Sequence, residues 1–468
     1  MRGMVFGVSM VGVMVSSVVA QPSGDWVGCA WDGTPAAINA VAVWDINGDG
    51  TSAVAPFLAT DSGVYSKGLT GPGIQLAFFS GSRVTSIATW DRDGDGPMTP
   101  ELVVVVQDSL FMPAEVYSVV LGSGGAEFSL LAIFDSDVRG LTSYDTDGDG
   151  VDELVAVGAF ESVVVDGVSM PMTRSAVFDG TGWSQLGTAP NSTCEVATVV
   201  ACSPADSVIP CEGDSTLVIG GFFTQAGGQT AEGIACWDDS AGDWGPCTVG
   251  TGLSGTTAVR EVVGWDSDEG PQLIVGGVNI WVDGVPSGDI VRYDGASWVQ
   301  MSGSTFGSPN ALATCDVDGD GVPEPVMAGL FNQGGSFPYL VAYWDGSDWV
   351  VLDGGQMTSG GATRGNGFVQ VDPNARGAAR PALMVVGHFD TIDGVSAENL
   401  AIWTPEGVGG PCNDADYAEP FGSLNFFDVS AFLMLFAAQD SAADLNSDGS
   451  WDFFDVQVYI TAFGQGCP

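Results

Sequence analysis

Lysine and histidine are almost missing from this chain, whose 468 residues include one lysine, Lys67, and one histidine, His388. A Ser-His-Asp triad or a histidine-ligated zinc site would have to use His388, and Schiff-base chemistry would have to use Lys67. His388 lies in the run VVGHF, where sister repeats carry Gly, Ala or Leu, so we interpret it as a strand-end residue. The composition therefore argues against most catalytic mechanisms.

Positive charge is also scarce. The chain has 58 acidic and 11 basic residues, and its formal net charge is −47. Such a field repels nucleic acid and anionic lipid, so we expect neither as a partner. Two readings of the acidity stay open: solubility in salty water, and cation binding. Both can hold in the same protein.

Long apolar runs are missing except near the start, and even there glycine interrupts the run. Residues 1–20 combine Arg2, an apolar stretch and the small-residue site Val18-Val19-Ala20 before Gln21. This order is typical of an export signal peptide. We expect a protein that is secreted, on the cell surface or in the periplasm, with no membrane span after cleavage of the signal.

An acidic loop recurs four times, each time between two short apolar runs. The copies read DINGDG, DRDGDG, DTDGDG and DVDGDG. Together with three degenerate copies they mark seven units, at intervals of roughly 50 residues, a period typical of propellers and solenoids. The seven anchor positions are Asp45, Asp91, Asp145, Ser203, Asp266, Asp316 and Asp372.

Each unit predicts four short strands. The run after the acidic loop is continuously apolar, as in Leu102–Val106 and Leu383–Val386, which favours a strand buried on both faces. Two further strands enclose Asp-Gly turns in the segments 176–187, 290–303 and 341–355. Seven such units predict an all-β, seven-bladed propeller over residues 21–410. Tryptophans recur at one repeat position, which favours packing between blades over a sugar platform: Trp183, Trp244, Trp298 and Trp349.

The ends of the repeat region predict how the ring closes. The seventh unit stops after LAIWTPEG (400–407) and lacks a tryptophan strand, whereas the mature N-terminus begins with SGDWVGC (23–29). We therefore predict that Asp25–Cys29 completes the seventh blade. Closure of this kind removes two exposed sheet edges.

Nine cysteines in an exported chain suggest disulfides. The spacing makes three pairs plausible, although sequence alone does not fix connectivity: Cys202–Cys211, Cys236–Cys247 and Cys412–Cys467. Three cysteines remain: Cys29, Cys194 and Cys315. Because their number is odd, at least one of these thiols is free or paired between chains.

A Gly/Pro linker separates the repeats from residues 411–468, which contain two related halves. Each half predicts an amphipathic helix, because apolar residues recur at helical spacing. These residues are Val429, Phe432, Leu433 and Phe436 in the first half, and Val456, Tyr459, Ile460 and Phe463 in the second. The module is therefore expected to be small and α-helical.

The loop before the second helix matches the EF-hand register. Its candidate calcium ligands are Asp444, Asn446, Asp448, Asp452 and Asp455, with Gly449 at the bend. The alternative is a turn and helix cap made of the same Asp and Asn residues. The loop of the first half is one residue too long between Asp416 and Asp428, and we favour a structural loop there.

The propeller loops supply a second set of candidate calcium ligands. Three like charges within a few ångströms repel unless a cation or protons neutralise them, and calcium prefers such oxygen ligands. The candidates are Asp45, Asn47, Asp49, Asp91, Asp93, Asp95, Asp145, Asp147, Asp149, Glu153, Asp316, Asp318, Asp320 and Glu324. The alternative is a set of Asp-Gly turns held by their own hydrogen bonds. Calcium, where bound, is expected to be a structural cofactor.

These loops resemble FG-GAP or VCBS-type repeats of calcium-bearing propellers. The C-terminal run NFFDVSAF, with Cys412 and the final Gly466-Cys467-Pro468, resembles the GC-type dockerin module. The second resemblance implies calcium-dependent folding and attachment to a cohesin-like or surface partner. The degenerate first loop departs from the two-calcium dockerin pattern.

We therefore expect an exported, calcium-stabilised scaffold or binding protein without catalytic activity. Its partner would be a protein or a glycan at the propeller loop face, where Trp281 and Phe337 are candidates for ligand contact. The alternative is a carbohydrate-active enzyme, either a glycoside hydrolase or a polysaccharide lyase, with two carboxylates at the central channel.

Overall fold

The described residues of the computed structural model form a mostly-β protein with seven antiparallel blade sheets, one separate two-stranded sheet and two C-terminal helices. It describes these residues: 24–28, 37–45, 54–66, 74–79, 81–92, 101–109, 111–122, 125–191, 196–202, 216–247, 253–254, 258–267, 270–301, 307–318, 322–331, 338–371, 382–405, 415, 417, 426–438, 443, 445 and 450–465. The predicted signal peptide lies outside them. Cys211, Cys412 and Cys467 also lie outside them, so the predicted disulfides Cys202–Cys211 and Cys412–Cys467 are not tested.

The first four blades follow the predicted order of four strands from the ring axis outward. Blade 1 contains β2 (Ile38–Asp45), β3 (Val54–Thr60), β4 (Gly63–Ser66) and β5 (Ile74–Phe78); blade 2 contains β6 (Arg83–Trp90), β7 (Glu101–Gln107), β8 (Ala114–Gly122) and β9 (Gly125–Phe134); blade 3 contains β10 (Val138–Tyr144), β11 (Glu153–Gly158), β14 (Ser175–Phe178) and β15 (Trp183–Gln185); blade 4 contains β16 (Val196–Cys202), β17 (Thr216–Gly221), β20 (Ile234–Asp238) and β21 (Asp243–Gly245).

The last three blades repeat the pattern, and the seventh takes its outermost strand from the start of the chain. Blade 5 contains β23 (Ala258–Ser267), β24 (Gly270–Val282), β25 (Val285–Tyr293) and β26 (Trp298–Gln300), with β22 (Leu253–Ser254) on β24; blade 6 contains β27 (Gly307–Cys315), β28 (Glu324–Phe331), β29 (Tyr339–Trp344) and β30 (Trp349–Thr358); blade 7 contains β31 (Arg364–Val371), β32 (Ala382–His388), β35 (Leu400–Pro405) and β1 (Gly24–Gly28).

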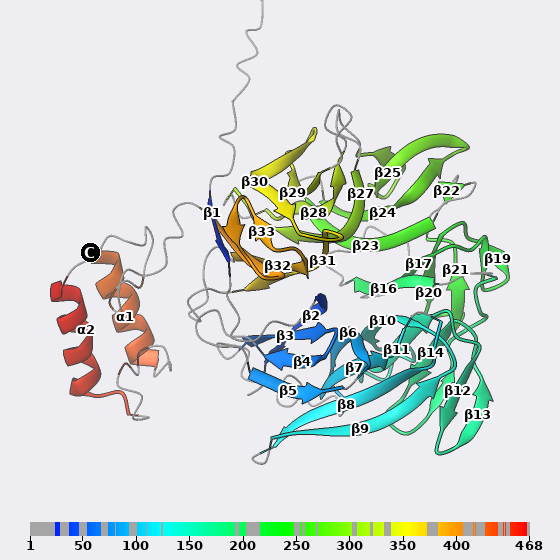
Figure 1. Cartoon of the computed structure of the whole chain (residues 1–468), viewed down its shortest axis with the longest axis horizontal. Helices are drawn as coiled ribbons and strands as arrows, with labels where there is room; N and C mark the ends of the chain where they lie inside the picture. The colour runs from blue at the N-terminus through cyan, green and yellow to red at the C-terminus, as the bar shows by residue number, and fades with distance from the viewer. Residues whose placement is uncertain are drawn as a thin grey trace, which may run out of the picture.

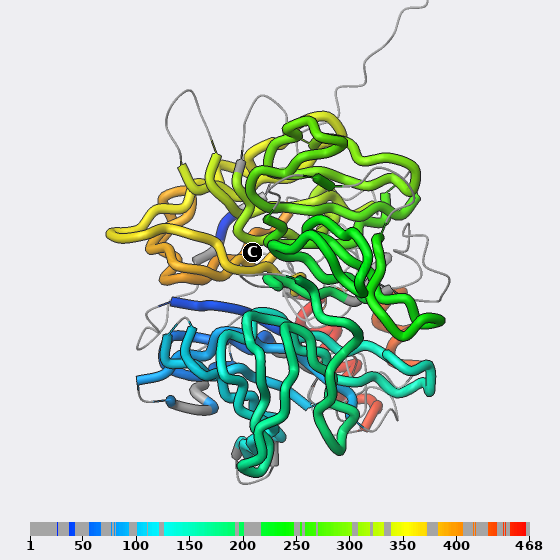
Figure 2. Tube along the Cα trace, turned by 90° about the vertical axis from the view of Figure 1, so that its right-hand side faces the viewer, coloured from blue at the N-terminus to red at the C-terminus, as the bar shows by residue number. Residues whose placement is uncertain are grey.

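The innermost strands form a closed ring. Each of β2, β6, β10, β16, β23, β27 and β31 contacts the next, and β31 contacts β2 in turn. Figure 1 shows these strands around the middle of the ring, with the outer strands fanning away from it. Figure 2, turned by 90°, shows the first and last blades side by side. The predicted seven-bladed propeller is confirmed.

The second strand of each blade is the most deeply buried, as its continuous apolar run predicts. All six residues of β11 are buried, and so are six of the seven residues of β7. Helix-forming patterns are absent from these runs, whose β-branched residues suit a strand covered on both faces by neighbouring blades. Each second strand lies between the innermost strand and the two outer strands of its blade.

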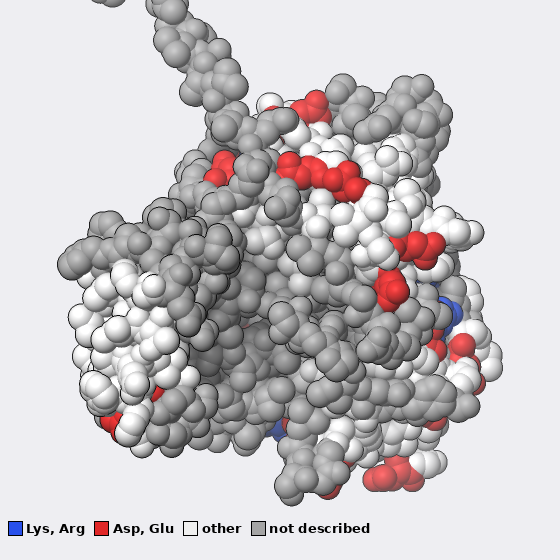
Figure 3. Space-filling view, turned by 60° about the vertical axis from the view of Figure 1, so that its left-hand side comes forward, with Lys and Arg blue, Asp and Glu red and all other residues white. Residues whose placement is uncertain are grey.

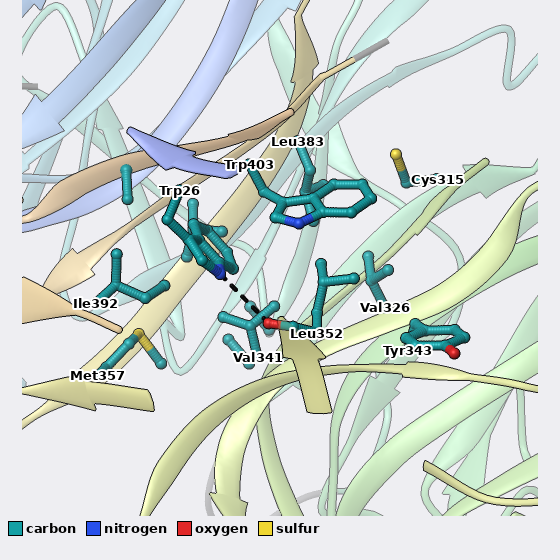
Figure 4. Packing of buried hydrophobic residues seen from close by; sticks show 14 of the residues in the cluster. Trp26, Cys315, Val326, Val341, Tyr343, Leu352, Met357, Leu383, Ile392 and Trp403 are labelled. Carbon is teal, nitrogen blue, oxygen red and sulfur yellow. Dashed lines mark hydrogen bonds between the residues drawn. The ribbon is translucent and has the colours of Figure 1, made fainter. Parts of the chain in front are cut away.

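The N-terminal strand closes the ring as predicted. β1 pairs antiparallel with β35, and Trp26 lies opposite Trp403. The Trp26 side chain is buried, and its indole N–H donates to the carbonyl oxygens of Leu352 at 3.3 Å and Asp353 at 3.1 Å, both in blade 6 (Figure 4). Asn366 in blade 7 also donates to the carbonyl of Ile38 in blade 1, at 2.8 Å. The N-terminal strand and blade 1 therefore both hold the seventh blade in place.

The repeated tryptophans lie between blades, which confirms the prediction from their spacing. The indole N–H of Trp244 donates to the carbonyl of Leu186 in the preceding blade at 3.1 Å. Trp349 donates in the same way to Met301 at 2.7 Å. Each acceptor follows the tryptophan of the preceding blade by three positions, so the same contact recurs between blades 3 and 4 and between blades 5 and 6.

Short hairpins, which we call clasps, extend from one blade toward a neighbouring blade. The repeat pattern did not predict them. β12 (Ser162–Val165) and β13 (Val168–Pro171) leave blade 3 and extend the sheet of blade 2 by pairing with β9. β33 (Thr391–Ile392) and β34 (Val395–Ser396) leave blade 7 and pair with β30 of blade 6. A similar pair, β18 (Gln225–Ala226) and β19 (Gln229–Thr230), leaves blade 4. The first two hairpins cover the outer edges of blades 2 and 6, which would otherwise be exposed.

The predicted Asp-Gly turns are present between the third and fourth strands. In blade 3, the Asp179 carboxylate accepts hydrogen bonds from the backbone of Thr181 at 2.7 Å and Gly182 at 2.8 Å. The Asp294 carboxylate does the same for Ala296 and Ser297 in blade 5. Hydrogen bonds from the Thr181 side chain and backbone hold the pKa of Asp179 below its ordinary value of 3.8, and those from Ser297 lower the pKa of Asp294.

These turns predict an acid-sensitive contribution to stability. A carboxyl with a lowered pKa in the folded state stabilises the fold above its ordinary pKa of 3.8, and that contribution is lost as pH falls through the lowered folded value. The double variant Asp179→Asn/Asp294→Asn is therefore expected to be less stable than the wild type at pH 6, with a difference that shrinks at pH 3. Urea midpoints at both pH values measure this, and an unchanged difference would contradict it.

The C-terminal module contains the two predicted helices, α1 (Phe426–Ala438) and α2 (Phe453–Gln465), drawn beside the ring in Figure 1. Phe432 stacks on Tyr459 with ring centroids 4.0 Å apart. The predicted apolar face is too wide, because Leu433 is 54% exposed and Ile460 is 62% exposed. Each helix has one helical partner here, so only the stripe through Phe432 and Tyr459 is covered.

One of the predicted disulfides is confirmed. Cys236 in β20 bonds to Cys247 just after β21, which ties together the two outer strands of blade 4. Cys315 is a buried free thiol at the end of β27. Among the described residues, no helix combines the length and the apolar character that crossing a bilayer requires.

Candidate metal centres

Four carboxylates converge in the acidic loop of blade 3, which joins β10 to β11. Asp145, Asp147, Asp149 and Glu153 each place one carboxylate oxygen within 4.8 Å of the others. The two oxygens of Asp145 accept hydrogen bonds from the backbone of Gly148 at 2.7 Å and Gly150 at 2.9 Å. Gly148 and Gly150 both have positive φ, which lets the loop fold its carboxylates toward one point.

Glu153 is the buried member of this cluster, with 7% of its surface exposed. Its Oε2 accepts hydrogen bonds from the backbone N–H and the hydroxyl of Thr146, both at 2.7 Å. Burial raises the pKa of Glu153, the Thr146 hydrogen bonds oppose the rise, and the charges of Asp147 and Asp145 add to it. A divalent cation would offset the burial and repulsion that disfavour the charged carboxylate.

The loop of blade 6 has the same design. Asp316, Asp318 and Glu324 place one oxygen each within 4.8 Å of one another. Glu324 begins β28, as Glu153 begins β11, and its Oε2 accepts a hydrogen bond from the backbone of Val317 at 2.8 Å. Val317 and Thr146 occupy the same repeat position, directly after the first aspartate. Asp320, the remaining predicted ligand, lies outside the described residues.

Two indoles support these glutamates from the preceding blade, and the sequence prediction missed them. Trp90, at the end of β6, donates to the carbonyl of Asp152 at 2.8 Å. Trp265, near the end of β23, donates to the carbonyl of Pro323 at 2.6 Å. Each acceptor directly precedes Glu153 or Glu324 in the chain. The available signal was an aromatic residue immediately before the anchor aspartate of the preceding repeat.

The remaining propeller loops are less complete. In blade 2, Arg92 lies 3.7 Å from Glu101 and donates to the carbonyl of Gly180 in blade 3 at 2.7 Å, so a guanidinium already accompanies that carboxylate. In blade 1, only the strand position of Asp45 is described. Blade 5 replaces the loop by a tight hairpin in which Ser267 pairs with Gly270. The predicted ligands Asn47, Asp49, Asp93 and Asp95 lie outside the described residues.

In the C-terminal module, the structure describes Asp452 and Asp455, whereas Asp444, Asn446 and Asp448 lie outside the described residues. The backbone of Asp452 donates to the buried Asp455 carboxylate at 2.9 Å, and Phe454 donates to Asp452 Oδ1 at 2.8 Å. These reciprocal bonds form a capping box at the start of α2. The helix-cap alternative is therefore present, and the same two carboxylates remain predicted EF-hand ligands.

The other residues singled out from the sequence are dispersed. His388 ends β32, as its interpretation as a strand-end residue requires, and it is half-buried. Trp281 lies in the outer part of β24 and is also half-buried, whereas Phe337 lies outside the described residues. Figure 3 shows one face of the molecule, on which described acidic residues far outnumber basic ones.

Comparisons with known proteins add little. No family model matches the chain, and neither does any curated protein. Similar solved structures include the exotype rhamnogalacturonan lyase YesX, with 15% identity, a TM-score of 0.40 and coverage of 78% of this chain and 61% of the lyase. The rhamnogalacturonan lyase PL11 of Bacillus licheniformis has 15% identity, a TM-score of 0.39 and coverage of 78% and 59%.

A gluconolactonase of Xanthomonas campestris is a third similar structure, with 12% identity, a TM-score of 0.37 and coverage of 82% of this chain and 99% of that enzyme. The chain spans about three-fifths of the two lyases it matches. Likeness this distant carries no argument about function. The class of protein, a seven-bladed β-propeller with acidic loops that could hold metal ions, follows from the strand pairing and the clusters above.

Proposed function

We propose that this chain is an exported, calcium-stabilised β-propeller that binds a protein or glycan partner without catalysis and is anchored through its C-terminal helix pair. The observation that carries the calcium assignment is the recurrence of one carboxylate geometry in blades 3 and 6. Oxygen ligands from Asp and Glu suit a hard cation such as calcium. Calcium would contribute by binding the folded loops, not by chemistry on a substrate.

The residues of both centres support a structural role. Their backbone hydrogen bonds fix the loops, and the supporting indoles of Trp90 and Trp265 tie each loop to the preceding blade. A bound cation would therefore fix a loop that also contacts the preceding blade. The C-terminal anchoring role is supported by the exposed apolar side chains of both helices, including Leu433, Met434 and Ile460, together with the dockerin-like motifs.

A carbohydrate-active enzyme is the second candidate, and Glu261 is the observation in its favour. Glu261 lies half-buried on the inner strand β23, where desolvation raises its pKa to about 8. General acids and bases work best when their pKa lies near the operating pH. The small counts of histidine and lysine leave carboxylates as the main catalytic candidates in this chain.

A polysaccharide panel separates the two candidates. We expect the purified protein, saturated with calcium, to release no new reducing ends and no unsaturated products from any member of the panel, while binding one or more glycans or a protein partner. Turnover that disappears in the variant Glu261→Gln, but persists in the matched surface variant Glu127→Gln, would overturn the non-catalytic proposal and identify the enzyme.

A further inference from the structure

The turn that joins β7 to β8 in blade 2 displays apolar side chains to solvent. Phe111 is 69% exposed, and its neighbour Met112 is 46% exposed. The backbone N–H of Met112 donates to the carbonyl of Ser109 at 3.2 Å. Because this turn follows the second strand of its blade, whereas the acidic loop precedes that strand, it lies at the end of the ring opposite the acidic loops.

The backbone of Phe111 is strained, with a φ of 63°. Among the described residues, nine other than glycine have positive φ, and six of these are Asp or Asn, whose short polar side chains tolerate that conformation. A bulky aromatic residue is disfavoured there, whereas glycine adopts it freely. The chain therefore keeps an exposed aromatic ring at a position where its backbone conformation is unfavourable, and strain of this kind clusters at functional sites.

A buried carboxylate of the next blade holds the turn in this conformation. Asp137, directly before β10 in blade 3, is fully buried, and its Oδ1 accepts hydrogen bonds from the backbone of Phe111 at 2.6 Å and from the Gln107 amide. The Gln107 amide also donates to the Met112 carbonyl at 2.7 Å, and Arg139 donates to Asp137 Oδ2 at 2.7 Å. Phe111 is therefore fixed before any partner arrives, which lowers the entropic cost of binding.

A second strained and bulky residue belongs to the same junction of blades 2 and 3. Arg174 also has a φ of 63°, and its carbonyl accepts a hydrogen bond from the backbone of Gly158 at 3.1 Å. The next residue, Ala159, donates to the carbonyl of Asp137 at 2.9 Å. Backbone contacts therefore connect Arg174 through Asp137 to Phe111, and two strained, bulky residues belong to one junction between two blades.

The charge that this junction presents to solvent is acidic. Three of its carboxylates are exposed: Asp108 directly after β7, Asp135 two residues before Asp137, and Glu161, whose backbone N–H donates to Asp135 at 2.9 Å. Its arginines are half-buried, and each lies beside a carboxylate. Arg139 pairs with Asp137, Arg174 lies 3.8 Å from Glu161, and Arg83 is paired in register with Gln107, which precedes Asp108. A partner therefore meets an apolar turn whose exposed charged neighbours are carboxylates.

We propose that the turn around Phe111 docks a segment of a partner protein in which Lys or Arg residues flank an apolar side chain. Aromatic residues and Met are enriched at protein interfaces, and the flexible Met112 side chain can adapt to the apolar group that packs on the turn. The basic side chains complement the exposed carboxylates, and one of them can lie over the Phe111 ring. The formal net charge of −47 steers a basic partner toward the propeller. This inference rests on the proposed binding role and specifies a protein as the partner.

Selection from a phage library of random twelve-residue peptides, against the calcium-saturated full chain, tests the proposal. Peptides that also bind the variant Phe111→Gly are removed, because this variant keeps every charge and so retains binding that depends on charge alone. We expect the remaining peptides to share Lys or Arg beside an apolar residue. The synthetic consensus peptide is expected to bind Phe111→Gly at least about tenfold more weakly than the wild type, and to bind Phe111→Tyr about as tightly.

Two further measurements separate binding from a structural role of the ring. The urea midpoint of Phe111→Gly should be no lower than that of the wild type, because relief of strain offsets the greater freedom of glycine in the unfolded chain. Glu161→Gln should weaken peptide binding by about threefold at low salt, and should have no effect at about 1 M salt, where exposed charges are screened. Val285→Ala is the control, since Val285 is 60% exposed but lies in blade 5.

Three results would overturn the proposal: no peptide that survives the subtraction, surviving peptides without basic residues, or a clearly lower urea midpoint for Phe111→Gly. Loss of glycan binding in Phe111→Gly, with peptide binding unchanged, would also overturn it and assign the turn to a glycan. The polysaccharide panel and the calcium-dependent melts do not use this turn, so a failure here leaves their outcome standing and the two proposals fail separately.

Discussion

Replacing Trp26 by alanine is expected to destabilise the propeller by about 3–5 kcal/mol, the usual cost of truncating a buried tryptophan. The side chain lies in the core that joins blades 6 and 7, next to Trp403 and Leu352 (Figure 4), and its indole N–H donates to two carbonyls. Without it, β1 loses the contact that fixes it to blade 6. Urea denaturation with the midpoint and slope fitted together measures the loss.

Two further variants test whether this loss of stability reflects ring closure. Trp26→Phe keeps an aromatic ring but removes the donor, so we expect a smaller loss, of about 1–2 kcal/mol. Deletion of residues 21–33 removes all five β1 pairs with β35 and should abolish cooperative unfolding. A synthetic peptide of residues 21–33 should restore it, and the same peptide with alanine at position 26 should not. A deletion protein that melts as sharply and as hot as the parent would disprove closure by β1.

Removing calcium is the second change with a large expected effect. A site occupied at a hundredfold its Kd stabilises by about 2.7 kcal/mol, so two such sites together contribute about 5 kcal/mol. Excess EGTA is therefore expected to lower the Tm by roughly 5–10 °C. Differential scanning calorimetry with and without added calcium measures the shift. An unchanged Tm in EGTA, from protein in which no metal is found, would contradict the calcium proposal.

The variant Glu153→Gln is expected to change stability in opposite directions with and without calcium. In the absence of metal, Glu153→Gln removes a buried carboxylate whose charged form is disfavoured by burial and by Asp147 and Asp145, so the variant should be as stable as the wild type or more stable. With calcium, the same variant should be less stable than the wild type, because a ligand is missing. Glu127→Gln, on the exposed face of β9, is the matched control and should respond to calcium as the wild type does.

The repeat architecture could be predicted because its signals are local. Apolar runs recur in each unit, Asp-Gly turns and one tryptophan position recur in several units, and the missing outer strand of the last unit matched the run around Trp26. The same local signals grouped Asp145, Asp147 and Asp149 with Glu153. The carboxylates meet because the loop is short and lies between paired strands.

Other features depend on contacts between units, which no single repeat reveals. The clasps of β12–β13 and β33–β34 pair with the preceding blade, so their partners are fixed only when the ring forms. The exposure of Leu433 and Ile460 depends on how many neighbours each helix has, and helical spacing alone does not report that number.

Anomalous diffraction at long wavelength, from crystals grown in calcium, tests the central claim most directly. The account predicts one peak among Asp145, Asp147, Asp149 and Glu153, and another beside Asp316, Asp318 and Glu324, each with oxygen ligands at about 2.3–2.6 Å. Well-ordered loops with no anomalous peak at either position would contradict it.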